Sequence, residues 1–353
     1  MLIDGKKVLV TGGTGSLGKV LVKRLLSGEI GSPERIVVFS RDEAKQHFMR
    51  LSYLNRKTAT DDIIYQNFQE KLTFRIGDIR DFHSVGGVLR DADIVINAAA
   101  LKQVPSCEYY PYEAVQTNIG GPENIIRAIR EHNLDVETVI GISTDKACKP
   151  VNVMGMTKAI QERVFIKANI DSPDTRFVCV RYGNVLASRG SVIPFFHEQI
   201  ENGGPVTITS AGMTRFLQSL DQAVDTVFTA LKEAKPGETY VPRVPAVRVM
   251  DIVDALIGNR RIKKVITGVR PGEKVHEILI TEEEIYRTFD RKKYYAIGPI
   301  LPELASKQII KPVLKDEYSS KDDLLSPKKV YELLKKNRLL LGDVIEEEGD
   351  VLR

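Results

Sequence analysis

The feature that most constrains the fold is a glycine-rich turn near the start of the chain. The sequence KVLVTGGTGSLGKVLVKRLL joins a buried-strand pattern to an amphipathic helical pattern. Gly13, Gly15 and Gly18 fit G-x-G-x-x-G, and Gly12 with the last two fits G-x-x-G-x-x-G. A strand before the glycines and a helix after them favour a bound dinucleotide over an empty tight turn, because the backbone then approaches the pyrophosphate and the helix N-terminus donates to it. The residues expected at this cofactor site are Gly12, Thr14, Gly15, Ser16, Leu17 and Gly18.

Strand and helix patterns go on alternating over about 180 residues. This alternation predicts an α/β fold, a Rossmann-type doubly wound parallel sheet with a smaller C-terminal α/β lobe that binds substrate. The polar stretch after the second helix, up to about Gln69, is expected to be an exposed loop. Further strands are expected at 35–39, 72–76, 92–97, 136–142 and 176–181, and helices at 43–57, 111–131 and from 151 onward.

Changes in this pattern divide the chain into three parts. We expect an NADP-binding domain over residues 1–183, to which some later segments return, and a substrate-binding lobe over 184–300. Residues 301–353 form a C-terminal extension whose SPKKVYELLKKNRLL predicts one amphipathic helix, and its last residues are expected to fray. The lobe is expected to contain strands at 205–209, 238–241 and 263–267 and helices at 193–201, 221–232 and 250–257.

Composition excludes several classes of protein. The net charge of +4 is small for 353 residues, so it does not argue for nucleic acid or a membrane surface, although it suits an anionic substrate. Cys107, Cys148 and Cys179 lack CxxC spacing and fit a reducing compartment. The chain leads from Met1 directly into a strand pattern and has no apolar run as long as a membrane span. We expect a cytoplasmic protein without a metal site.

The residues after the second strand bear on the type of cofactor. An NAD site usually has Asp or Glu at this strand end, whereas a guanidinium accommodates the 2′-phosphate of NADP. This chain has Ser40 and Arg41 there, with Lys45 one turn later. We therefore expect NADP, and the alternative that Asp42 reads the ribose of NAD stays open.

The next two strand ends are expected at the same site. Asp78 and Ile79 follow the third strand, where an adenine is expected. Ala98 and Ala100 follow the fourth strand, and their small side chains allow close approach of the cofactor. Lys102 then faces either the substrate or solvent.

The stretch STDKACKPVNVMGMTK, Ser143–Lys158, follows the fifth strand. It is expected to form a strand end, a loop and the start of a helix, because a proline interrupts it and helical spacing follows. Asp145 and Lys146 then lie at the sheet edge, and Met154 shares a helix face with Lys158 four residues on. Two lysines and a carboxylate that converge on one crevice suggest proton transfer.

Several motifs occur together in one order: TGGTGSLG, FSRDEAKQ, NAAALKQVP, STDKACKPVN with Lys158, RYGNVLASRGSVIPFF, MTRF and RPGEK. Together they resemble the extended short-chain dehydrogenase/reductases, and most of all the UDP-N-acetylglucosamine 4,6-dehydratases of bacterial and archaeal surface-sugar pathways. The resemblance covers residues 5 to about 285. It implies that a hydride leaves sugar C4 for NADP, water is lost across C5 and C6, and the hydride returns to C6. The product is a UDP-4-keto-6-deoxy-N-acetylhexosamine.

The resemblance also implies roles for individual residues. Lys146 is the base at C5, which requires a lowered pKa, and Lys158 and the cationic nicotinamide are expected to lower it. Asp145 protonates the departing C6 hydroxyl, which requires a raised pKa. Thr144 hydrogen-bonds the C4 oxygen, and Lys158 holds the nicotinamide ribose. Gly183 joins the cofactor site, and the expected substrate site consists of Lys102, Asn184, Val192, Phe196, Gln199, Arg270 and Glu273.

Two of these assignments have alternatives. Arg270, beside Glu273 in VRPGEKVHEILI, either grips a diphosphate or belongs to a charged surface turn. Most of the superfamily has a tyrosine where this chain has Met154, and a thioether cannot transfer a proton. Some dehydratases resemble this chain in carrying Met there, so Thr144, Asp145 or a water is left to manage the C4 proton.

Three readings of the function stay open. A dehydratase, with inversion at C5 slightly favoured over retention, is the leading one. A UDP-sugar 4-epimerase needs no lysine base at C5, and an inactive NADP-binding protein is suggested by Met154 but disfavoured by the intact Asp145, Lys146 and Lys158. We also expect a homo-oligomer, a dimer or larger, because the helix after residue 151 has extra apolar positions and relatives pair through this helix.

Overall fold

The computed structural model describes residues 1–54, 61–186, 192–305 and 311–343. A nine-stranded sheet forms the centre of this part of the chain, and its strands are β1 (Lys7–Thr11), β2 (Arg35–Ser40), β3 (Leu72–Ile76), β4 (Ile94–Asn97), β5 (Thr138–Thr144), β6 (Arg176–Tyr182), β10 (Thr239–Pro242), β14 (Thr288–Arg291) and β15 (Tyr294–Ile297). They lie in the order β14-β15-β10-β6-β5-β4-β1-β2-β3. All neighbours from β10 to β3 are parallel, whereas β15 is antiparallel to both of its neighbours.

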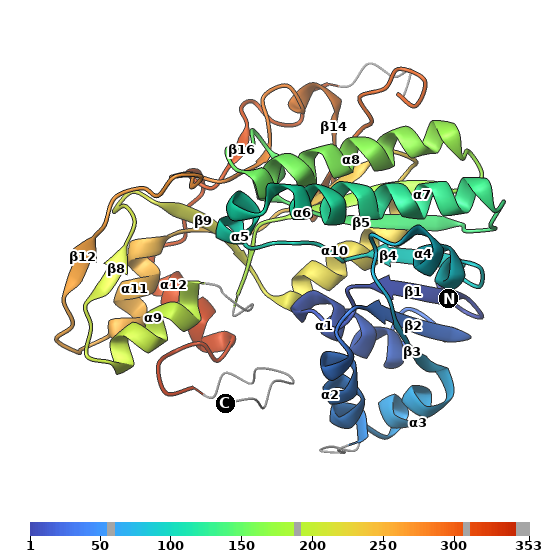
Figure 1. The fold of residues 1–353 in the computed structure, drawn as a ribbon. Coiled ribbons are helices and arrows are strands. Elements are labelled where there is room, and N and C mark those ends of the chain that lie inside the picture. Colours follow the sequence, from blue (N-terminus) through green and yellow to red (C-terminus); the bar gives the residue numbers. More distant parts are fainter. Residues whose placement is uncertain (55–60, 187–191, 306–310, 344–353) are drawn as a thin grey trace.

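Helices cover both faces of this sheet (Figure 1). On one face lie α1 (Ser16–Leu26) and α10 (Leu220–Glu233), and on the other α4 (Phe82–Leu89), α7 (Gly121–Glu131) and α8 (Val153–Asp171). Side chains of a strand point alternately to the two faces, so Val8 and Val10 pack with α1 while Leu9 packs with α4 and α7. A sheet buried on both faces explains the continuous apolar runs of its strands and confirms the predicted fold class.

The expected loop before residue 69 is wrong, because a helix lies there. After α2 (Glu43–Leu54), α3 (Asp61–Lys71) packs against α1. Ile64 and Phe68, four residues apart, both reach the core, and the Phe68 ring stacks on Tyr53 with centroids 5.5 Å apart. Few apolar side chains are therefore enough to hold this polar helix against the core.

A smaller lobe lies beside the central sheet (Figure 1). Its strands are β7 (Asn184–Val185), β8 (Val206–Ile208), β9 (Thr214–Gln218), β11 (Ala246–Arg248), β12 (Lys264–Ile266), β13 (Ile278–Ile280) and β16 (Tyr318–Ser319), and its helices are α9 (Val192–Glu201), α11 (Val249–Ile257) and α12 (Pro327–Lys336). The helix predicted in the C-terminal extension is α12, and its Val330 and Leu334 are fully buried in the core that α9 and α11 share. The residues expected to fray lie outside the described ranges.

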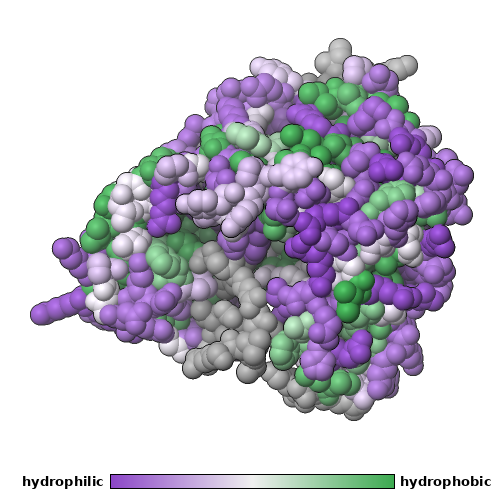
Figure 2. Space-filling view, viewed as in Figure 1, coloured by the Kyte–Doolittle hydropathy of each residue, from purple (hydrophilic) through white to green (hydrophobic). Residues whose placement is uncertain are grey.

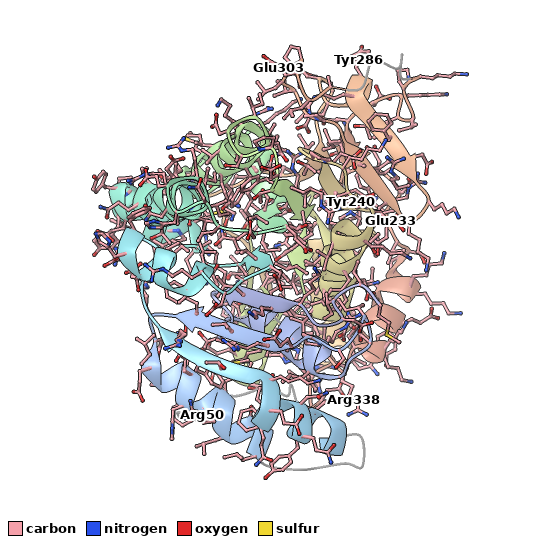
Figure 3. The ribbon with its side chains drawn as sticks, turned by 90° about the vertical axis from the view of Figure 1, so that its right-hand side faces the viewer. Arg50, Glu233, Tyr240, Tyr286, Glu303 and Arg338 are labelled. Carbon is pink, nitrogen blue, oxygen red and sulfur yellow. The ribbon has the colours of Figure 1, made fainter. Side chains whose placement is uncertain are left out.

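Segments after residue 184 also complete the central sheet. These are β10, β14 and β15 with the helix α10. Tyr240 of β10 is fully buried and lies in the interior in Figure 3, whereas Arg50 lies at the periphery.

Most of the face drawn in Figure 2 is hydrophilic. Among the residues described, none of the helices has the length and apolar composition needed to cross a bilayer.

Candidate active site

A cavity of about 1130 Å³ opens at the carboxyl ends of β1, β2, β4, β5 and β6. The chain leaves β1 toward β2 on one side and reaches β4 on the other, so the cavity lies where the strand order reverses, which is where this fold class binds ligands. Most of the predicted site residues line it, namely Gly12, Thr14, Gly15, Ser16, Leu17, Gly18, Ser40, Arg41, Lys45, Ile79, Ala98, Ala100, Lys102, Thr144, Lys146, Met154, Lys158, Gly183 and Asn184.

The other predicted residues are not part of the cavity wall: Asp78, Asp145, Val192, Phe196, Gln199, Arg270 and Glu273. Phe196 is buried in the core of the smaller lobe, and Gln199 hydrogen-bonds the side chain and backbone of Thr207. Arg270 is exposed, while Glu273 is partly covered and its Oε2 has no hydrogen-bond partner among the described residues.

The glycine-rich turn fits the pyrophosphate of a dinucleotide. Gly12 has φ of +64°, and a Cβ there would lie 2.7 Å from the Ala99 nitrogen, so only glycine fits this position. Helix α1 begins at Ser16, and its N-cap Gly15 has no side chain to cap the first amides. These amides, at the positive end of the helix dipole, are available to an anion.

Two cations lie where the second strand enters the cavity. Arg41 is half exposed, with Nη1 3.6 Å from Asp78 Oδ2, and Lys45 Nζ lies 2.9 Å from Asp42 Oδ2. The Ser40 hydroxyl accepts a hydrogen bond from Gln46 at 3.0 Å, so its own proton is available to a ligand. The arrangement can therefore accommodate extra negative charge beside the ribose.

Asp78 acts behind this pair of cations. Its carboxylate accepts from Arg80 Nη2 at 2.7 Å. Burial raises the pKa of Asp78, but the Arg80 and Arg41 guanidinium groups outweigh it, so the net pKa lies below its usual value. An ionised Asp78 can orient Arg41 without touching a ligand.

The end of β5 and the 3-10 turn that follows it, Asp145–Ala147, place three chemically active residues beside the cavity. Thr144 Oγ1 donates to Asp145 Oδ1 at 2.7 Å, and Lys146 Nζ donates to the same oxygen at 3.1 Å. The Asp145 side chain is fully buried, and Oδ2 has no hydrogen-bond partner within the described ranges. Asp145 thus lies behind the cavity wall, and the Thr144 hydroxyl connects the two.

Lys146 lies between two carboxylates. Its side chain is 23% exposed, and Nζ lies 3.5 Å from Glu277 Oε1. Burial lowers the pKa of Lys146, but attraction to Asp145 and Glu277 outweighs it, so the pKa lies above its usual value. The expectation of a lowered pKa is therefore wrong for this structure, because the sequence did not show that Glu277 lies beside the amine.

Lys158 has the opposite environment. The side chain is 5% exposed, and Nζ donates to the Ile142 carbonyl and, at 2.6 Å, to Gln161 Oε1. Burial lowers the pKa of Lys158 to about 8. Both acceptors are uncharged, and the amine has a third N–H that can donate to a ribose hydroxyl.

Helix α8 is held close to the catalytic loop. Asn152 caps it by accepting from the Gly155 nitrogen at 2.8 Å. A Cβ on Gly155 would lie 2.2 Å from the Lys146 carbonyl oxygen, so a larger residue would push helix and loop apart. Met154 is 4% exposed, packs with Cys107 and Ala114, and contributes to the cavity wall.

A buried ionic network contacts the loop that follows β5. Arg181, 3% exposed, donates to Glu162 Oε2 at 2.6 Å, to Glu284 Oε2 at 2.8 Å and to Cys148 Sγ at 3.0 Å. Burial raises the pKa of Glu284, but the adjacent Arg181 outweighs it and lowers this pKa to about 2. Burial also raises the pKa of the Cys148 thiol, which does not suit a nucleophile.

Sequence reasoning missed three residues near the reactive groups. Tyr182, opposite Thr144 in the β5–β6 pairing, lines the cavity, and burial raises the pKa of its phenol. Glu277 faces Lys146, and Arg215 Nε lies 3.9 Å from Glu277 Oε1. Arg215 belongs to the motif MTRF, and Glu277 lies three residues after the motif RPGEK. These motifs could have drawn attention to both residues, but neither residue was assigned a role from the sequence.

Comparison with known proteins places the chain in a family. The family model described as polysaccharide biosynthesis protein matches residues 8–299. A UDP-N-acetylglucosamine 4,6-dehydratase (inverting) of Campylobacter jejuni is 41% identical over 301 residues, 84% of each chain. A UDP-glucose 4-epimerase of Rickettsia bellii is 43% identical over 302 residues, again 84% of each chain.

Solved structures agree with the fold. Pen from Bacillus thuringiensis superposes with a TM-score of 0.84 and 33% identity, covering 96% of this chain and 100% of that one. A dTDP-glucose 4,6-dehydratase from Streptomyces venezuelae with bound NAD reaches 0.62 at 19% identity, covering 76% and 86%, which supports the fold alone. The chain therefore belongs to the polysaccharide biosynthesis protein family of extended short-chain dehydrogenase/reductases, as its motifs predicted, and its similar relatives are enzymes named dehydratases and epimerases.

Proposed function

We propose that the chain is an NADP-dependent UDP-N-acetylglucosamine 4,6-dehydratase that forms a UDP-4-keto-6-deoxy-N-acetylhexosamine with inversion at C5. The observation that carries the proposal is the arrangement of Thr144 and Lys146 at the cavity edge, with Asp145 hydrogen-bonded to both from behind the cavity wall. Dehydration needs a base for the C5 proton and an acid for the C6 hydroxyl, and these residues supply both. The named relative from Campylobacter jejuni supports the same substrate and stereochemistry.

The residues around the cavity fit a nicotinamide dinucleotide. The glycine-rich turn suits the pyrophosphate, Ser40, Arg41 and Lys45 suit a 2′-phosphate, and Lys158 suits the nicotinamide ribose. When bound, this cofactor would supply the hydride acceptor for sugar C4 and the hydride donor for C6, so that none would be consumed. We assign NADP rather than NAD because Arg41 and Lys45 lie at the end of β2, where the adenosine ribose is expected. Asp42, which would contact the ribose of NAD, is paired with Lys45 instead.

The proton of the C4 hydroxyl leaves through Thr144. Met154 cannot accept it, and burial raises the pKa of Tyr182, so this phenol stays protonated and offers no phenolate to take the proton. The Thr144 hydroxyl lines the cavity and already donates to Asp145, so it can accept from C4 while it gives its own proton to the carboxylate. Asp145 then holds one proton, which it returns through the same hydroxyl to the C6 oxygen as water leaves.

Lys146 acts on C5. Lys146 lines the cavity, and the ketone at C4 makes the neighbouring C5 proton acidic enough for an amine to remove. The lysine later returns a proton to C5, and inversion requires that the intermediate first turn the opposite face of C5 toward this lysine. Across one turnover the C4 hydroxyl proton departs in the water molecule, and each protein group regains its starting state.

A 4-epimerase is the second candidate, because relatives with this name are as similar as the dehydratase. Incubation with UDP-N-acetylglucosamine in heavy water, without added cofactor, separates the two by mass spectrometry and NMR. The dehydratase product lacks the C6 oxygen and carries deuterium at C5. A product that keeps its C6 oxygen would overturn the proposal, and absence of turnover beside intact NADP binding would favour an inactive binding protein.

We also propose that the enzyme is a cytoplasmic homo-oligomer. All three cysteines are free and buried, which suits a reducing compartment. On α8, Met156 and Ile160 are about half exposed, and Tyr112 nearby is more exposed still. Figure 2 shows hydrophobic residues among hydrophilic ones where Figure 1 places α8. Light scattering of the purified protein tests the assembly, and a monomer would exclude it.

A further inference from the structure

The environment of Lys146 raises a question about one proton. Attraction to Asp145 and Glu277 raises the pKa of this lysine, so the resting enzyme holds an ammonium at neutral pH. A lysine removes a proton from carbon only as the neutral amine. Asp145 is occupied by the C4 proton at that moment, so the proton of Lys146 needs another acceptor.

Glu277 is placed to be that acceptor. Its side chain is 4% exposed, and Oε1 lies 3.5 Å from Lys146 Nζ, a separation that a small side-chain adjustment closes to a hydrogen bond. Oε2 is buried and has no hydrogen-bond partner in the described part of the chain. Ser320 fixes the backbone, since its hydroxyl accepts from the Glu277 nitrogen at 2.9 Å and its nitrogen donates to the Glu277 carbonyl at 2.8 Å.

Burying a carboxylate with one oxygen unpaired costs free energy of folding. A functional role would explain why such a group is kept. Arg215 Nε lies 3.9 Å from Oε1 of Glu277, beyond hydrogen-bond distance, while Arg215 Nη1 donates to the Thr214 carbonyl at 2.7 Å. Within the described ranges, Asp145 and Glu277 are the carboxylates within ion-pair distance of Lys146. Asp145 exchanges its proton with the cavity through Thr144. Glu277 is therefore the carboxylate that remains to accept a proton from Lys146.

We propose that Glu277 is a positioning residue that takes the proton of Lys146, stores it while the neutral amine acts on C5, and then returns it. The inference rests on the proposed dehydration. It adds a residue from the smaller lobe to a reaction otherwise performed by the β5 end.

The proton balance closes. Glu277 takes a proton from the Lys146 ammonium, leaving a neutral amine and a neutral acid. The amine takes the C5 proton while Asp145 gives its proton to the C6 oxygen, and water leaves. Lys146 then gives a proton to C5, and Glu277 returns the stored proton to the amine.

The charges of the site favour this order of events. When Asp145 has accepted the C4 proton, Lys146 has lost one of the two negative charges that hold its own proton. Transfer to Glu277 then replaces a buried ion pair by a neutral pair, which needs less solvation. The lysine therefore gives up its proton more readily once C4 has been oxidised.

The pH dependence of C5 exchange separates storage from simple charge pairing. Incubating the 4-keto-6-deoxy product with the enzyme in heavy water exchanges its C5 proton without hydride transfer, and NMR follows the exchange. An internal transfer from Lys146 to Glu277 involves no net proton, so the wild-type rate should be flat through neutral pH. Loss of the lysine proton to solvent would instead make the rate rise about tenfold per pH unit.

Glu277→Gln keeps the shape of the side chain but cannot store the proton. We expect C5 exchange about tenfold slower or more at neutral pH, with recovery as pH rises. A single turnover should still produce reduced cofactor, because C4 oxidation comes first. Glu277→Asp should restore part of the rate and the flat profile, and Glu282→Gln, a change in an exposed carboxylate that pairs with Lys149, should have no effect.

Two results would overturn the inference. One is a Glu277→Gln enzyme as fast as wild type at neutral pH, or faster, as expected of a mere counter-ion. The other, which needs no variant to fold, is a wild-type exchange rate that rises steeply through neutral pH. Failure of the wild-type enzyme to dehydrate UDP-N-acetylglucosamine would refute the proposed function instead.

Discussion

Replacing Thr144 by valine tests the proton path most directly. Valine has the size of threonine but lacks the hydroxyl that lines the cavity and donates to Asp145 at 2.7 Å. If this hydroxyl passes the C4 proton inward, the Thr144→Val substitution breaks the path and leaves Lys146 beside Asp145. The change should stop C4 oxidation while the cofactor and the sugar nucleotide still bind.

The structure sets the expected magnitude. Loss of positioned proton transfer lowers kcat by about 100- to 10,000-fold, which corresponds to about 3 to 5 kcal/mol of barrier. The hydrogen bond lost from Asp145 is one to a charged, buried group, so Thr144→Val should also lower the free energy of unfolding by about 1.5 to 3 kcal/mol. The effect on rate should therefore exceed the effect on stability.

The assay is the absorbance of reduced nicotinamide in a single turnover. Thr144→Ser should recover most of the rate. Thr117→Val is a matched control, because Thr117 lines the same cavity and its buried hydroxyl has no hydrogen-bond partner among the described residues. Wild-type formation of reduced cofactor in Thr144→Val would refute the path through this hydroxyl.

Three further changes test other parts of the structure. Arg41→Ala should weaken NADP binding about tenfold and leave NAD binding unchanged, and calorimetric titration showing an unchanged ratio would contradict the assignment. Glu284→Gln leaves Arg181 partly unpaired and should cost about 3 to 5 kcal/mol at neutral pH. Because the folded pKa of Glu284 is lowered to about 2, this stabilisation is full above the usual carboxylate pKa and disappears as pH falls toward 2, which denaturant titration at several pH values measures. Leu334→Ala should cost about 2 to 5 kcal/mol, and a much smaller loss would show that α12 is not part of the lobe core.

Local sequence was sufficient for the cofactor-binding half of the fold. The strand, glycine turn and helix at residues 7–26 are close together in the chain, so their spacing alone predicts the structure. Alternation of apolar and polar runs likewise predicts the parallel sheet. The sequence did not predict the helix α3, because this helix has few apolar side chains. Ile64 and Phe68 can be recognised as core residues only when the positions of α1 and β2 are known.

The surroundings of Lys146 and Lys158 could not be predicted from the local sequence. The two lysines suggested mutual repulsion, yet Lys158 turns to neutral acceptors and Lys146 to carboxylates. The decisive partner, Glu277, lies far along the chain from Lys146. Burial of Phe196 in the lobe core and engagement of Gln199 by Thr207 are also results of tertiary packing.

Contacts from the smaller lobe explain why the loop after β5 depends on distant residues. Lys274 donates to the Cys148 carbonyl, Asn152 donates to the Gly272 carbonyl at 2.7 Å, and Lys149 pairs with Glu317 at 2.9 Å. The segment that carries RPGEK therefore holds the catalytic loop as well as supplying Glu277. A lobe that moved relative to the sheet would shift the carboxylate and the lysine it faces together. Since a transferable proton requires a nearly constant donor–acceptor distance, these contacts support the proposed transfer between Lys146 and Glu277.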